Sequence, residues 1–104
     1  MITQKEILAT IKVIVTKEIP DAKVYLFGSQ ATGAHHEESD WDILILTEKK
    51  YPKSVKWLIQ DKLFPLSLSI GSVFSYTLAT NDEWENDPAY YSLQKGIGDQ
   101  YLVL

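Results

Sequence analysis

The chain has 104 residues, of which 45% are hydrophobic and 23% are charged, and this length and composition predict one globular domain over residues 1–104. Its net charge of −4 argues against a protein that grips nucleic acid over a broad face, because phosphate binding needs clustered Lys and Arg. The absence of cysteine excludes disulfides, thiolate catalysis and sulfur-bound zinc. There is no signal-peptide pattern and no apolar run near the roughly 20 residues that span a bilayer, so we expect a soluble, cytoplasmic protein with no membrane partner.

The first half of the chain predicts a helix followed by two strands. Residues 3–6 have the spacing of a helix capping box, and apolar residues then recur at helical spacing until Pro20. A short apolar run at residues 23–27, which ends at a glycine, predicts the first strand. Residues 40–47 contain a continuous apolar run and predict a central strand that is covered on both faces.

The second half predicts a helix, a strand and a short C-terminal region. Residues 53–63 have amphipathic helix spacing, and Pro65 is expected to end that helix. Apolar and small polar residues alternate next, which predicts a third strand over residues 66–78 with a bulge at residues 71–72. The remaining predicted elements are a short helix that begins at residues 87–88 and an extended segment at residues 100–104.

Asp40 and Asp42 are the clearest candidates for a chemical site. Because strand side chains alternate between faces, aspartates at i and i+2 project from the same face near the start of the strand. Two carboxylates around 4 Å apart repel by about 4 kcal/mol at an effective dielectric near 20, and a bound cation removes that cost. Oxygen ligands suit a hard ion, Mg²⁺ or Mn²⁺, held together with water and substrate phosphates.

The turn after the first predicted strand supplies the other half of such a site. Backbone N–H groups at Gly28 and Ser29, with the Ser29 hydroxyl, are suited to hold phosphates. Taken alone, this turn is equally well interpreted as a plain strand-to-helix connection with Ser29 as the N-cap. Together with the aspartates, it indicates a nucleoside triphosphate bound through a metal ion.

The segments Gly28-Ser29, Gly33 and Ser39-Asp40-Trp41-Asp42-Ile43 match the pattern G-S…G…S-D-x-D-[LI]. In this the chain resembles the DNA polymerase beta-like nucleotidyltransferase superfamily, in its minimal single-domain branch. The resemblance implies an α+β fold with a small mixed sheet and helices packed mainly on one face. It also implies transfer of a nucleoside monophosphate from a metal-bound triphosphate such as ATP to an acceptor hydroxyl, with release of pyrophosphate. Asp40 and Asp42 become catalytic metal ligands, and the implied nucleotide-binding residues are Gly28, Ser29, Gln30, Gly33 and Ser39.

Two departures from the family pattern leave the activity open. Gln30 stands where minimal members often carry Arg, and its neutral amide holds phosphate less strongly. The family's third carboxylate lies on the next strand, whereas the polar face of that predicted strand carries serines. Either Asp61, Asp82 or Glu83 completes the site, or a second metal is held weakly, or the domain binds nucleotide without efficient transfer. The alternative to an active enzyme is a catalytically weak or inactive binding module that acts as an antitoxin or regulator.

No acceptor-binding domain is visible in the sequence. We therefore expect a partner chain or a homo-oligomer to supply the acceptor. The resemblance points to the helical HEPN toxins that often accompany minimal nucleotidyltransferases, in which case the acceptor would be a tyrosine of the toxin.

Overall fold

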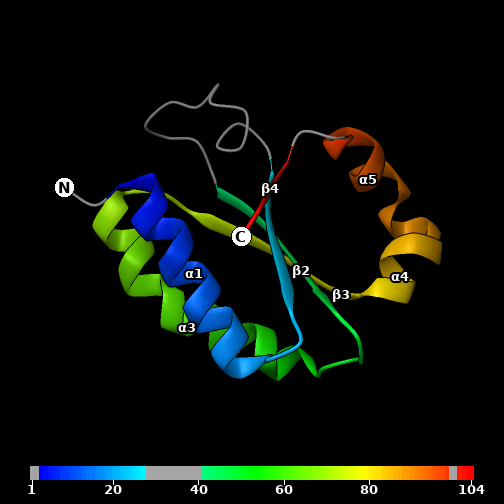
Figure 1. Ribbon diagram of the computed structural model, residues 1–104, viewed down its shortest axis with the longest axis horizontal. Helices are drawn as coiled ribbons and strands as arrows, with labels where there is room; N and C mark the ends of the chain where they lie inside the picture. The colour runs from blue at the N-terminus through cyan, green and yellow to red at the C-terminus, as the bar shows by residue number, and fades with distance from the viewer. Residues whose placement is uncertain (1–2, 28–40, 99–100) are drawn as a thin grey trace.

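The computed structural model describes residues 3–27, 41–98 and 101–104. The helices in these ranges are α1 (Gln4–Glu18), α3 (Lys53–Ile70), α4 (Asn81–Asn86), the 3₁₀ helix η1 (Pro88–Tyr90) and α5 (Tyr91–Ile97). The strands are β1 (Lys23–Phe27), β2 (Trp41–Thr47), β3 (Phe74–Thr80) and β4 (Tyr101–Val103). They form one mixed sheet in the order β3-β2-β1-β4, with α1 and α3 side by side on one face and α4 and α5 beyond the other (Figure 1). The predicted α+β fold with a small mixed sheet is confirmed, and helices cover both faces of the sheet, with the two long ones together on one face.

Helix α1 begins where the capping pattern predicts. The Thr3 hydroxyl oxygen accepts a hydrogen bond from the Glu6 backbone N–H at 3.2 Å, which satisfies one of the helix's unpaired first-turn donors. Ile11 and Val15, one turn apart, are fully buried against the sheet. The buried stripe, rather than the cap, holds α1 in place, since a helix of this length is only marginally stable alone.

Strand β2 lies at the centre of the fold, antiparallel to β1 and parallel to β3. Ile43 and Ile45 are fully buried toward α1 and α3. Leu44 and Leu46 point to the opposite face and are also buried, in a smaller cluster with residues from α4 and η1. This strand is therefore covered on both faces along most of its length, as its continuous apolar run predicts.

The predicted end of the second long helix at Pro65 is wrong. Helix α3 continues through Pro65 to Ile70 and ends at Gly71, which adopts the left-handed conformation with φ 68°. The apolar residues that hold this extension on the core recur at i, i+4, i+7 and i+11: Ile59, Leu63, Leu66 and Ile70. Their burial outweighs the missing Pro65 backbone donor, so residues 66–70 are helical, and the predicted strand and bulge over residues 66–72 are wrong as well.

The third strand is shorter than predicted. Strand β3 begins at Phe74, in register with Trp41, and runs parallel to β2 as far as Thr80. The predicted C-terminal elements are confirmed: the Asp87 side chain caps η1 through the Ala89 N–H, and β4 pairs with β1. Within the described ranges, no helix is long and apolar enough to cross a membrane.

Candidate functional site

Asp42 is the second residue of β2, and its side chain is half-buried. Strand alternation places it on the same face as Leu44 and Leu46, away from α1 and α3. Its register partners are Phe27 at the end of β1 and Ser75 near the start of β3. A carboxylate therefore lies at one end of the central strand, on the face that the long helices leave uncovered.

The structure describes only one of the seven residues predicted for this site. Asp42 is placed as expected, at the start of the second strand. The other predicted residues, Gly28, Ser29, Gln30, Gly33, Ser39 and Asp40, lie outside the described residues. Their roles remain predictions.

None of the three acids considered as a third ligand lies beside Asp42. Asp82 and Glu83 are in the first turn of α4, directly after Thr80, which pairs with Thr47. Thr47 is five strand residues from Asp42, a separation of about 16 Å. Asp61 is exposed on α3, which covers the opposite face of the sheet.

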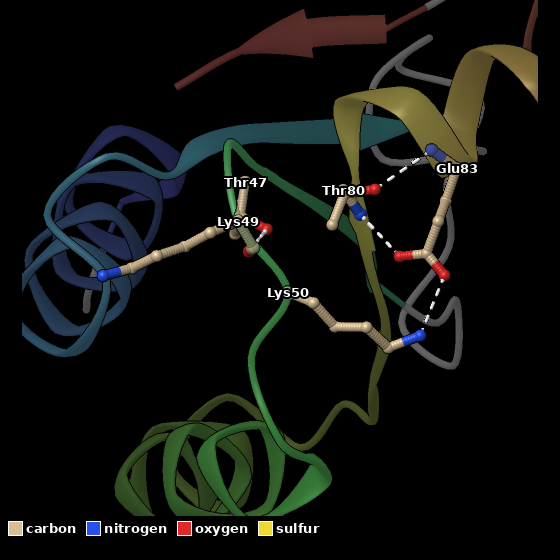
Figure 2. A network of polar contacts seen from close by, with 5 residues as sticks. All are labelled: Thr47, Lys49, Lys50, Thr80 and Glu83. Carbon is tan, nitrogen blue, oxygen red and sulfur yellow. Dashed lines mark hydrogen bonds and ion pairs between the residues drawn. The ribbon is translucent and has the colours of Figure 1, made fainter.

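Glu83 has a structural role at that far end of the sheet. Its carboxylate accepts hydrogen bonds from the Thr80 backbone N–H at 3.0 Å and from the Lys50 ammonium at 3.2 Å, while the Thr80 hydroxyl accepts from the Glu83 N–H (Figure 2). The Thr80 N–H, followed by Lys50, lowers the pKa of Glu83. This capping box starts α4, and it commits Glu83 to the folded structure rather than to a ligand.

Ser75 is the residue that the sequence interpretation missed. It is exposed and stands directly opposite Asp42 on the neighbouring parallel strand, with both side chains on the same face. The whole of β3, with sequence FSYTLAT, contains no acidic residue. The serines considered earlier in the chain, Ser67 and Ser69, belong to α3. The predicted strand over residues 66–78 already contained Ser75, but its polar face was assigned from serines that precede the observed start of β3 at Phe74.

The oxygen groups at this end of β2 fit a metal ion that arrives with a phosphate ligand. Asp42 offers one carboxylate and Ser75 one hydroxyl at the same register. The described part of the chain holds no group of three or more His, Cys, Asp or Glu side chains placed to bind a metal. Mg²⁺ is commonly held by one or two carboxylates together with phosphate oxygens and water, and Asp42 suits that mode rather than an all-protein cage.

Solved structures share this fold. A crystal structure of a toxin-antitoxin with AMP-PNP superposes with a TM-score of 0.66 at 20% sequence identity, covering 97% of this chain and 72% of that chain. A crystal structure assigned to a nucleotidyltransferase superposes with a TM-score of 0.62 at 26% sequence identity, covering 93% of this chain and 96% of that chain. A structure of a tri-AMPylated Shewanella oneidensis HEPN toxin in complex with an MNT antitoxin gives a TM-score of 0.62 at 20% sequence identity, covering 97% of this chain and 71% of that chain. The arrangement of helices around the mixed sheet is thus that of minimal nucleotidyltransferases.

A search of curated proteins finds no match to this sequence. The family model described as a nucleotidyltransferase domain matches residues 8–95, which include Asp42 and Ser75 and extend from α1 into α5. That match covers most of the chain, including β2 with Asp42. The chain therefore belongs to the nucleotidyltransferase domain family.

Proposed function

We propose that this chain binds a nucleoside triphosphate with Mg²⁺ at the start of β2 and transfers the nucleoside monophosphate to an acceptor hydroxyl. The position of Asp42 carries the proposal. Its partner across the sheet, Phe27, is the last residue of β1, and Gly28 and Ser29 follow it in the sequence. In the sequence, the residues proposed to hold phosphate thus directly follow the strand residue that pairs with the proposed metal ligand.

Asp40 and Asp42 would hold the ion together with phosphate oxygens, and the backbone N–H groups of Gly28 and Ser29 would hold the remaining phosphate charge. Gln30, Gly33 and Ser39 complete the proposed nucleotide-binding set. The ion supplies charge neutralisation of the triphosphate and a lower pKa for a bound hydroxyl. The acceptor oxygen bonds to the α-phosphorus as the bond to the pyrophosphate oxygen breaks, and the hydroxyl proton leaves to solvent.

The acceptor would be supplied by another protein chain. One structural neighbour is an MNT antitoxin in complex with an AMPylated HEPN toxin, and another is a toxin-antitoxin with AMP-PNP. By this similarity we propose a tyrosine hydroxyl of a HEPN-type helical partner as the acceptor and ATP as the donor. A second copy of this chain is the other partner that the proposal allows.

A second function, binding of the nucleotide without efficient transfer, is favoured by one observation. Ser75 occupies the strand position beside Asp42, and β3 has no carboxylate. A serine hydroxyl is a neutral and therefore much weaker ligand for a divalent ion than a carboxylate. A domain that holds Mg²⁺ through two aspartates alone would then act on its partner as an antitoxin by binding.

Transfer is tested with radiolabelled ATP, Mg²⁺ and a candidate HEPN toxin, reading both label on the toxin and released pyrophosphate. Asp42→Asn should lose labelling, whereas Asp61→Asn, the same change at an exposed position of α3, should label like the unmodified chain. Triphosphate binding without labelling would support the binding module. Equal labelling by the Asp42→Asn variant would contradict the proposed site.

A further inference from the structure

Helix α3 carries apolar residues on two opposite sides. The residues on its core side pack toward the sheet: Ile59, Leu63, Leu66 and Ile70. At about 100° per residue, Trp57, Phe64 and Leu68 lie on the opposite side, where they are 59%, 53% and 67% exposed. A helix that is covered on one side normally carries polar residues on the other, and one that is apolar all round is normally buried. The outer side of α3 therefore has the composition of a covered surface.

Trp57, Phe64 and Leu68 form one row, which we call the outer stripe. They recur at i, i+7 and i+11, so the stripe extends about 17 Å along the helix. Single exposed apolar residues are normal on a protein surface, whereas an aligned apolar patch marks an interaction site. Tryptophan is also among the residue types that contribute most to binding at the centres of protein interfaces. The outer stripe thus has the character of a protein-protein interface.

The outer helical layer is large enough for a specific interface. Helix α1 lies beside α3 on the same face of the sheet, and its Val13 is 64% exposed (Figure 1). Helices of 18 and 15 residues are about 27 Å and 22 Å long and about 10 Å wide, so the two together present roughly 500 Å² in projection. The accessible surface of such a ridged face exceeds its projection, and a specific interface buries at least about 600 Å² on each partner.

The charges of α3 favour an antiparallel second copy of the same helix. Lys53 is exposed, lies one turn before Trp57 on the same side, and stands at the N-terminal end of α3, where the helix dipole disfavours a cation. The last turn of α3 has no basic residue to complement its negative end. Antiparallel packing centred on the outer stripe places Trp57 against Leu68 of the second copy, and it places Lys53 beside the second copy's C-terminal helix end. Parallel packing would instead bring the two Lys53 ammonium groups together.

We propose that two copies of this chain form a two-fold dimer in which their α3 helices pack antiparallel through the outer stripes, with α1 alongside. The same patch then serves both copies, as two-fold symmetry requires. Asp42 lies on the opposite face of the sheet, so the dimer leaves both Asp42 faces open to other molecules. The proposal is independent of the proposed function, because it uses no residue of that site.

Sedimentation equilibrium over a range of protein concentrations tests the dimer. The unmodified chain should have the mass of two chains, and Phe64→Glu should raise the dissociation constant by at least roughly 100-fold. Leu68→Lys gives a second reading at the end of the stripe. Tyr91→Glu, also a charge on an exposed aromatic residue but on α5, should leave the dimer unchanged, and circular dichroism shows that each variant is folded. An unmodified chain with the mass of one chain throughout, or a Phe64→Glu variant that dimerises equally well, would overturn the proposal.

A distance between spin labels tests the antiparallel orientation. The chain has no cysteine, so Ser54→Cys, at an exposed position in the first turn of α3, attaches a single label to each copy. Antiparallel packing should place the two labelled residues about 25 Å apart along the helix axes, whereas parallel packing should place them about 10 Å apart. Lys53→Glu should weaken the dimer roughly 3- to 10-fold, and Lys95→Glu, the same charge change on α5, should not. A separation near 10 Å with no effect of Lys53→Glu would overturn the proposed arrangement.

Discussion

The substitution Ser75→Asp introduces a carboxylate at the position opposite Asp42 and tests whether the lack of one limits the site. Neighbouring strands are about 4.8 Å apart, so the two carboxylates would lie about 5 Å apart. Their repulsion is about 3 kcal/mol at an effective dielectric of 20 and about 1 kcal/mol in water. Because Ser75 is exposed and Asp42 half-buried, the variant should lose roughly 1–3 kcal/mol of unfolding free energy without a divalent ion.

Mg²⁺ should reverse this loss, because a cation between the carboxylates removes their repulsion. At 100 times its dissociation constant, the ion adds about 2.7 kcal/mol to the stability of the folded state. Urea unfolding with and without Mg²⁺ measures both effects, and the transfer assay should show increased labelling of the partner. Two controls should show neither effect: Ser75→Asn, which adds similar bulk without charge, and Ser69→Asp, which adds charge on the exposed surface of α3. A Ser75→Asp variant whose stability is insensitive to Mg²⁺ would refute the reasoning.

The remaining predictions concern the scaffold, and each is read from urea unfolding. Ile45→Ala should cost about 2–5 kcal/mol, because Ile45 is fully buried, whereas Val13→Ala, 64% exposed on α1, should change stability by less than about 0.5 kcal/mol. Pro65→Ala should stabilise the protein by about 2 kcal/mol, since it restores a backbone donor inside α3; destabilisation would contradict the account of that helix. Thr80→Ala should cost about 1 kcal/mol through loss of the α4 cap. The pKa of Glu83 is lowered in the folded state, so its ionised carboxylate stabilises the fold fully above the ordinary value of 4.5, and this stabilisation is lost as pH falls through the folded-state pKa. Glu83→Gln should therefore make the free energy of unfolding depend less on pH below 4.5.

Local signals in the sequence predicted the first half of the fold well. Thr3 caps α1 through a contact confined to four consecutive residues, and β1 runs between a turn and a glycine. The unbroken apolar run of β2 required cover on both faces, and the structure provides it. These predictions succeeded because each depends on interactions within a few residues or on the composition of a single strand.

Helix α3 shows where sequence reasoning failed and why. Leu66, Leu68 and Ile70 alternate with serine and fit a strand, but Leu66 and Ile70 also continue the helical stripe of Ile59 and Leu63. The same residues satisfy both periods, and the proline was taken to decide between them. Burial against the core overrides one missing hydrogen bond, a balance that depends on the packed tertiary structure.

That error carried over to the site. Because the third strand was predicted to start at residue 66 rather than at Phe74, its polar face was assigned from serines that belong to α3. Ser75, which lies beside Asp42 on the neighbouring strand, was overlooked. The aspartate itself was found because alternation within one strand defines its face. Its neighbour on β3 depends on the parallel register between strands that are far apart in the sequence, and local patterns do not encode that register.

The central claim is that the start of β2 holds the metal and the phosphates of a nucleoside triphosphate. A crystal structure with Mn²⁺ and a non-hydrolysable triphosphate tests it directly, because the anomalous signal of manganese locates the ion. We expect an anomalous peak within coordination distance of an Asp42 carboxylate oxygen, with the triphosphate bound to the same ion. Triphosphate bound elsewhere, with no manganese at Asp42, would contradict the account.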